Sequence, residues 1–242
     1  MTGHFLRIAH NSLNHCPLDT DYLECSLPAY FERVVERHSA KLAIADDDVQ
    51  FTYQQAHQKV GKLASAIWTA RVSGVVAVYL PNCADMVIAF WGIMKAGCAV
   101  VLIDPALPEE RCRFMLEDAR AAAVITRSDL IETTQAFDHF DVPILRIDQL
   151  PMKSDETISM QVHVNDPATL VYTSGSTGQP KGIMHSHKAW MTSIAYVALC
   201  ERYVPEDRIA QVYSPSSAAS IIGVVYALLT GASIHMFDAN KY

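Results

Sequence analysis

Short runs rich in valine and isoleucine alternate with amphipathic helical segments along most of this chain, and no other feature restricts its fold as strongly. Several of the helical segments repeat apolar residues at helical spacing, as Ala56, Val60 and Ile67 do. Alternation over this many cycles predicts an α/β fold with a mostly parallel sheet that is covered by helices. The expected strands are residues 42–45, 49–51, 75–80, 98–103, 122–126, 144–147 and 168–173.

Helix boundaries follow from capping signals. Thr52, with Gln55 three residues later, forms a capping box, so we expect a helix to begin after Thr52. Gly97 should end the helix that follows the strand at 75–80. Residues 150–166 are polar and weakly periodic, which predicts a long surface connection.

Composition and charge argue against several classes of protein. Of the 242 residues, 50% are hydrophobic and 19% are charged, as expected for a folded chain rather than a disordered one. A net charge of −7 disfavours a nucleic-acid binder and a polybasic membrane-surface protein. The N-terminus has no apolar core of signal-peptide length, so we predict a cytoplasmic protein with free thiols.

One stretch requires a separate test for a membrane span. Residues 209–237 contain no Asp, Glu, Lys or Arg, and a stretch of this length could cross a bilayer. Its longest unbroken apolar run, however, covers only residues 221–229. We therefore predict a core helix followed by a buried strand, and no membrane contact.

A short segment after the strand at 168–173 carries the residue types that bind phosphate. It reads TSGSTGQPKG over residues 173–182. Its glycines allow successive N–H groups to face an oxyanion, its hydroxyls are further donors, and its lysine suits a polyphosphate. Composition alone would equally fit a solvated turn with a surface lysine. The candidate phosphate-binding residues are Thr173, Ser174, Gly175, Ser176, Thr177, Gly178 and Lys181.

Residue order separates these alternatives. The segment is not a Walker A loop, because proline precedes the lysine and glycine follows it. It resembles, nearly residue for residue, the phosphate-binding signature of the adenylate-forming superfamily: acyl- and aryl-CoA synthetases, adenylation domains of non-ribosomal peptide synthetases, and luciferases. Three weaker matches occur in the family's order, at residues 51–53 (FTY), 94–105 (MKAGCAVVLIDP) and 226–232 (YALLTGA).

The resemblance covers about residues 28–238 and implies the N-terminal portion of the adenylate-forming enzyme fold. On this basis, we expect residues 1–27 to be an N-terminal extension. Residues 28–242 would then be an incomplete N-terminal AMP-binding domain, from which the family's C-terminal lid domain is absent.

The chemistry that the resemblance implies is ATP-dependent activation of a small carboxylic acid. The carboxylate attacks the α-phosphorus of ATP to give an acyl-adenylate and pyrophosphate. The acyl group then passes to the thiol of CoA or of a carrier protein's phosphopantetheine. The loop residues would hold the β- and γ-phosphates, and Mg²⁺ would accompany ATP. The family's Mg²⁺-ligating Glu has no match in this chain, and we predict no catalytic residue and no metal ligand within it.

The identity of the acid stays open. Peptide-synthetase domains that take α-amino acids usually carry an Asp ahead of the helix with the YALLTGA run, and Ala218 occupies that position here. A buried ammonium without a carboxylate partner is costly, so an amino acid is the alternative substrate class. Ser216, Ser217 and Ala218 are the candidate pocket residues, although small residues could equally pack against another helix.

Other polar residues are predicted to have structural roles. His185 and His187 follow the loop, but a carboxylate nucleophile is already ionised near pH 7 and needs no base. His187 is instead expected near the start of a helix that runs from Ser186 towards Leu199. The acidic run at residues 46–48 is predicted to be a solvated turn between two strands, and Asp104 belongs to a structural turn motif.

Two functions therefore compete. The first is an acid–thiol ligase, of which this chain, inactive alone, is the N-terminal part, because the family's later motifs have no match in it. The second is a non-catalytic fragment or a split subunit that binds a partner chain. An unfinished sheet with an exposed edge, and an apolar face at residues 221–237, would favour such a partner, for example the family's C-terminal portion or a carrier protein.

Overall fold

The computed structural model describes residues 18–19, 21–137, 140–150, 160–173, 180–201 and 203–238. The strands in these ranges are β1 (Leu42–Ala45), β2 (Gln50–Thr52), β3 (Val75–Tyr79), β4 (Ala99–Ile103), β5 (Ala123–Thr126), β6 (Ile144–Arg146), β7 (Pro167–Thr173), β8 (Lys181–Ser186), β9 (Arg208–Gln211) and β10 (Ser233–Met236). The helices are α2 (Leu27–His38), α3 (Tyr53–Thr69), α4 (Ala84–Lys95), α5 (Glu109–Asp118), α6 (Ser128–Ile131), α7 (His187–Glu201) and α8 (Ala218–Leu229), with 3₁₀ turns η2 (Tyr22–Glu24) and η3 (Ile147–Gln149).

The larger sheet has six strands in the order β6-β5-β3-β4-β7-β8. All neighbours in it are parallel except β7 and β8, which form an antiparallel pair. Its central strands are buried on both faces: Val76 and Val78 face one apolar cluster, whereas Ala77 and Tyr79 face a second. Burial on both faces explains why these strands read as continuous hydrophobic runs.

A second sheet has four strands in the order β2-β1-β10-β9. The β1–β2 hairpin is antiparallel, whereas β10 is parallel to both β1 and β9. The predicted α/β fold with mostly parallel strands is confirmed, and the structure adds that the strands divide between two sheets. Late strands β9 and β10 join the early strand β1 in one sheet, a long-range arrangement that strand patterns alone do not specify.

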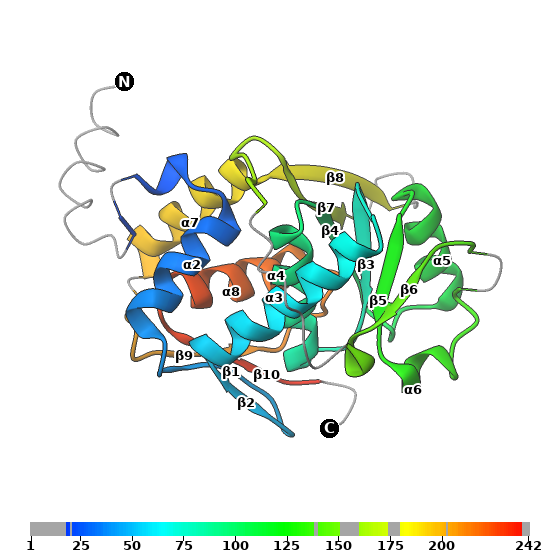
Figure 1. The fold of residues 1–242 in the computed structure, drawn as a ribbon, viewed down its shortest axis with the longest axis horizontal. Coiled ribbons are helices and arrows are strands. Elements are labelled where there is room, and N and C mark those ends of the chain that lie inside the picture. Colours follow the sequence, from blue (N-terminus) through cyan, green and yellow to red (C-terminus); the bar gives the residue numbers. More distant parts are fainter. Residues whose placement is uncertain are drawn as a thin grey trace.

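Helices fill the space between the two sheets (Figure 1). Helix α4 contacts β3 and β4 of the larger sheet and also β1 of the smaller one, while α8 packs on β9, β10 and α2. At the crossing of α3 and α4, a Cβ on Gly92 would come within 2.8 Å of Leu63 Cδ2, so only glycine fits this close approach. Helix α5 covers the far face of the larger sheet with Cys112, Met115 and Leu116.

The local signals in the sequence are confirmed. Gln55 N–H donates to Thr52 Oγ1 at 3.3 Å, and Thr52 N–H donates to Gln55 Oε1 at 2.9 Å, which completes the capping box at the start of α3. Gly97 follows α4 with a φ of 76°, a conformation that favours glycine. The uncharged stretch 209–237 divides into β9, α8 and β10. Among the described helices, none combines the length and apolar composition needed to cross a bilayer.

The acidic turn between β1 and β2 is structural. Asp46 Oδ1 accepts hydrogen bonds from the backbone N–H groups of Asp48 at 2.9 Å and Val49 at 2.8 Å. Its Oδ2 accepts from Ala84 N–H at 2.8 Å, at the first residue of α4. One carboxylate thus shapes the turn and also fixes it to the helix layer.

Histidine 187 generates a prediction about pH. It begins α7, is 1% exposed, and its Nδ1 has no hydrogen-bond partner among the described residues. Burial lowers the pKa of His187 from 6.5 to about 4, so the folded protein resists protonating it. As the pH falls from about 6.5 towards 4, His187 binds a proton in the unfolded chain but stays neutral in the folded chain. The free energy of unfolding should therefore fall with slope up to about 1.4 kcal/mol per pH unit.

Urea unfolding of wild type and His187→Gln at pH 7, 6 and 5 measures this contribution. The His187→Gln variant should lose less stability than wild type between pH 7 and pH 5. His163→Gln, at a position that is not buried, is the matched control and should follow wild type. Parallel pH profiles for wild type and His187→Gln would contradict the assignment.

Candidate functional site

The candidate phosphate-binding segment lies between the two strands of a hairpin. Thr173 is the last residue of β7, Lys181 is the first of β8, and the two are register partners. Thr173 Oγ1 lies 3.5 Å from the backbone oxygen of Lys181, and both residues are exposed. The structure therefore brings the two ends of the predicted loop together. Ser174, Gly175, Ser176, Thr177 and Gly178 lie outside the described residues.

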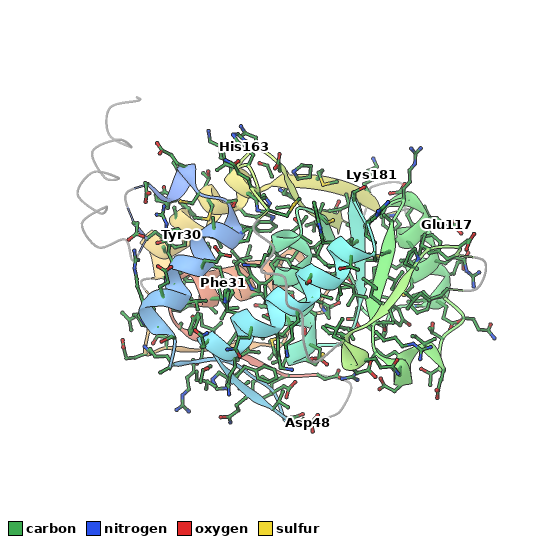
Figure 2. The ribbon with its side chains drawn as sticks, in the orientation of Figure 1. Tyr30, Phe31, Asp48, Glu117, His163 and Lys181 are labelled. Atoms are coloured by element: carbon green, nitrogen blue, oxygen red, sulfur yellow. The ribbon has the colours of Figure 1, made fainter. Side chains whose placement is uncertain are left out.

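The position of this hairpin in the sheet suits ligand binding. Because β7 runs parallel to β4, the segment after Thr173 leaves the sheet at the carboxyl ends of the parallel strands. Open α/β sheets bind their ligands outside this edge. Lys181 and the acidic turn at Asp48 lie far apart, at opposite sides of the view in Figure 2.

The three candidate pocket residues lie together at the start of α8. Ser217 is the N-cap: its Oγ accepts a hydrogen bond from Ser220 N–H at 3.1 Å. Ser216 Oγ accepts from the backbone N–H of Asp104 at 2.8 Å. Ala218 is the exposed first residue of the helix. Both serine hydroxyls thus already hold backbone groups, whereas the methyl group of Ala218 forms no such bond.

Asp104 connects loops that follow strands of the two sheets. It is 7% exposed, and its carboxylate accepts hydrogen bonds from Ala106 N–H at 2.9 Å and from Ser214 Oγ at 2.5 Å. Nearby, Asn82 Nδ2 donates to the backbone oxygens of Tyr213 at 2.8 Å and Phe237 at 3.1 Å. These bonds join the loops after β3 and β4 to those after β9 and β10, which supports the structural role predicted for Asp104.

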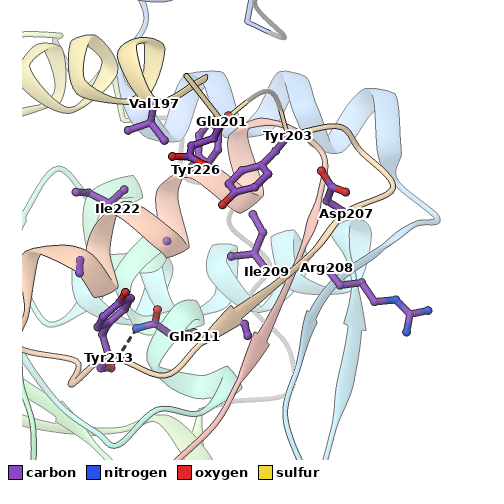
Figure 3. Close-up of a pocket in the computed structure, with 13 residues that line it drawn as sticks. Val197, Glu201, Tyr203, Asp207, Arg208, Ile209, Gln211, Tyr213, Ile222 and Tyr226 are labelled. Carbon is purple, nitrogen blue, oxygen red and sulfur yellow. Dashed lines mark hydrogen bonds between the residues drawn. The ribbon is translucent and has the colours of Figure 1, made fainter. Parts of the chain in front are cut away.

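A pocket of about 600 Å³ lies between α7, α8 and β9 (Figure 3). Gln211 closes one end, where its Nε2 donates to Ser220 Oγ at 2.5 Å and to the backbone oxygen of Tyr213 at 3.2 Å. Strand β9 is an edge strand of the smaller sheet. The apolar run at 221–237 pointed to this surface, but the contribution of α7 and β9 was not apparent from sequence. The principal apolar lining residues are Val197, Tyr203, Ile209, Ile222 and Tyr226.

His185 and His187 do not come together with other described polar side chains to form a site. His187 is buried at the helix start, and the His185 ring packs 5.2 Å from that of Trp190. Within the ranges that the structure describes, His, Cys, Asp and Glu side chains nowhere gather in a group of three or more that could hold a metal ion.

The fold and the signature hairpin define a chain of the adenylate-forming class. A family model described as AMP-binding enzyme matches residues 31–241. The chain belongs to this family.

Among curated proteins, the chain is similar to short parts of much longer synthases, one of them a dimodular non-ribosomal peptide synthase. The chain is 34% identical over 215 residues to a linear gramicidin synthase from Brevibacillus parabrevis and 29% identical over 216 residues to tyrocidine synthase 1 from the same organism. It is 29% identical over 217 residues to a dimodular non-ribosomal peptide synthase from Bacillus subtilis. These matches cover 87%, 88% and 86% of this chain but only 4%, 20% and 9% of the respective relatives.

Solved structures share the fold. A form of the non-ribosomal peptide synthetase FmoA3 with bound α-methyl-L-serine-AMP superposes with a TM-score of 0.81, at 23% identity, over 95% of this chain and 26% of FmoA3. A complex of VinN with 3-methylaspartate gives a TM-score of 0.78 at 22% identity, over 90% of this chain and 63% of VinN. At these identities the likeness supports the architecture only.

The N-cap of α8 yields a stability prediction. Ser217→Ala removes the acceptor for Ser220 N–H and should lower the free energy of unfolding by about 1 kcal/mol. Ser193→Ala changes an exposed serine within α7 and should leave stability unchanged or slightly raised. Urea unfolding at pH 7 measures both variants. Equal stability of Ser217→Ala and wild type would show that Ser217 does not cap the helix.

Proposed function

We propose that the protein containing this chain activates a small carboxylic acid with ATP and transfers the acyl group to the phosphopantetheine thiol of a carrier protein. The observation that carries this proposal is the register pairing of Thr173 with Lys181, which brings both ends of the phosphate signature to one point. Membership of the AMP-binding family supports the use of ATP. Peptide-synthetase relatives favour a carrier protein over CoA as the acceptor.

In this proposal, the chain's own residues stabilise the departing pyrophosphate. A carboxylate oxygen of the acid bonds to the α-phosphorus, and the bond from that phosphorus to the α–β bridging oxygen breaks. Lys181 and the Thr173 hydroxyl would hold the β- and γ-phosphates, with further hydroxyl and amide donors from Ser174, Gly175, Ser176, Thr177 and Gly178. Such positioned charge stabilisation is the principal catalytic contribution in phosphoryl-group chemistry. Mg²⁺, bound with ATP, would supply further neutralisation of the phosphates.

The acid is proposed to be held near Ser216, Ser217 and Ala218, at the start of α8. An α-amino acid needs a carboxylate beside its ammonium, and Ala218 supplies none at the position that the family's motif gives to Asp. We therefore propose a carboxylic acid without an ammonium bound at this position. An amino acid remains the alternative class, supported by the amino-acid ligands named for VinN and FmoA3.

We further propose that residues 28–242 form the N-terminal part of an AMP-binding domain, after an extension at 1–27. The family model, which matches residues 31–241, supports the proposed start of the domain near residue 28. The pocket along the edge strand β9, whose apolar residues offer a surface for further protein, supports its being only the N-terminal part. The same surface favours the second candidate function, a split subunit that assembles with another chain.

Substitution of Lys181 tests the proposed phosphate role directly. In the natural protein at its full length, Lys181→Ala should weaken Mg·ATP binding by more than tenfold, or about 1.4 kcal/mol. Lys188→Ala removes an exposed lysine of α7 that lies outside the signature and should bind Mg·ATP as wild type does. Calorimetric titration gives the dissociation constants. Equal affinity of Lys181→Ala and wild type would refute the phosphate role.

The domain proposal is tested by activity. Residues 1–242 alone should catalyse no ATP–pyrophosphate exchange with any member of a panel of α-amino acids and their des-amino counterparts. The natural full-length protein should show exchange, with the des-amino acids preferred. Exchange by residues 1–242 alone would contradict the domain proposal, and exchange that appears only on adding a second polypeptide would favour the split subunit.

A further inference from the structure

We propose that Tyr172 and Asp118 position Lys181 for the nucleotide's phosphates, because their hydrogen bond fixes the β7–β8 hairpin to helix α5. This inference rests on the proposed function and assigns to it two residues that lie outside the phosphate signature. Both are positioning residues, because they would act through the strand that carries Lys181.

Tyr172 immediately precedes Thr173 and points away from the exposed loop into the protein. It is 8% exposed and belongs to the apolar cluster between the larger sheet and α5. Its hydroxyl donates to Asp118 Oδ2 at 2.6 Å and lies 3.3 Å from the backbone oxygen of Met115. Burial, and secondly the Asp118 carboxylate, raise the pKa of Tyr172, so the hydroxyl keeps its proton at neutral pH. The last buried residue before the loop is thus tied to α5 at a defined point.

The position of β8 in the sheet depends on β7. In the larger sheet β8 is an edge strand whose one described partner is β7, and Lys181 and its next three residues are exposed. Among the described strands, none besides β7 therefore holds Lys181 in place. Any shift of β7 along or across the sheet would move Lys181 with it.

Gly182 follows Lys181 in β8, and its backbone packs against the ring of Tyr172 in β7. It is the register partner of Tyr172. A Cβ at Gly182 would lie 3.3 Å from Tyr172 Cε1 and Cζ and 3.0 Å from Leu170 Cδ1. The tyrosine ring thus packs against the backbone of the residue next to Lys181, and a larger side chain there would push the ring aside.

Asp118 stands where a carboxylate is electrostatically unfavourable. It is the last residue of α5, near the negative end of the helix dipole, and the last turn contains no basic residue. An acidic group there destabilises a helix. The hydrogen bond from buried Tyr172 offsets that cost, because a hydrogen bond to a charged acceptor is stronger than one to a neutral acceptor. In Figure 2, Glu117 at the end of α5 and Lys181 at the start of β8 lie on the same side of the molecule.

Equilibrium binding of Mg·ATP to the natural full-length protein tests the proposal. Tyr172→Phe and Asp118→Ala each remove the bond and should weaken binding by about fivefold, with the double variant no weaker than either single one. Asp118→Asn keeps an acceptor oxygen and should bind Mg·ATP within about twofold of wild type. Asp118 is exposed, so its variants should fold even if Tyr172→Phe does not.

Tyr79→Phe is the matched control. Tyr79 lies in the same apolar cluster, is 3% exposed, and its hydroxyl bonds Thr134 Oγ1 at 3.2 Å, but its strand carries no residue of the phosphate signature. This variant should lose stability without losing affinity for Mg·ATP. Amide hydrogen exchange at residues 181–184 should accelerate in Asp118→Ala and not in Asp118→Asn or Tyr79→Phe.

The outcomes separate this inference from the proposed function. Absence of Mg·ATP binding by wild type, or wild-type affinity in Lys181→Ala, would overturn the phosphate role and the positioning role with it. Weak binding by Lys181→Ala together with wild-type binding by Asp118→Ala would overturn the positioning role alone. An equal loss of affinity in Tyr79→Phe would also overturn it, because the effect would then belong to the whole cluster.

Discussion

Burial of both faces of the parallel strands is the constraint on which the rest of the structure depends. Val76 and Val78 project to one side of β3, and Ala77 and Tyr79 to the other, so water must be excluded from both faces. Helix α5 provides cover on one face. On the other face, helices α3 and α4 cover the sheet, and these helices are themselves apolar on several sides. The smaller sheet buries the apolar sides of these helices that do not face the larger sheet. The second sheet is thus a consequence of the hydrophobicity of the helix layer.

The loops at the carboxyl ends of the strands face conflicting demands. They hold the two sheets together and, in the proposed function, also supply polar groups to a ligand. Asn82 and Asp104 meet the first demand with hydrogen bonds across the two sheets. Ser216 and Ser217 lie next to the proposed acid site, and their hydroxyls also accept hydrogen bonds from backbone N–H groups. Substitutions there would alter stability together with specificity, whereas Ala218 could vary more freely because its side chain forms no hydrogen bond.

Much of this architecture could be predicted from local patterns, and what could not be predicted is non-local. Periodicity and capping signals such as Thr52 with Gln55 act within a few residues, and they correctly identified most strands and helices. Pairing of β1 with β10 depends on contacts almost two hundred positions apart in the chain, which no local pattern encodes. Strand β9 was missed because it is short, and three of its four residues are exposed or half-buried. Within the site, the residue types were apparent from sequence, but the placement of Lys181 on a strand was not.

Placement of the lysine on a strand changes how the proposed phosphate site would work. In a Walker A loop the lysine leads into a helix, whose N-terminal dipole adds to the attraction of anions. Here Lys181 begins an edge strand, and β-sheets have only a small net dipole, so that contribution is missing. The protein also carries a net charge of −7, which gives no general attraction for ATP. In the proposed function, affinity for ATP would then come from donors held at fixed positions, and the attachment of the hairpin to the core would matter as much as the charge of Lys181.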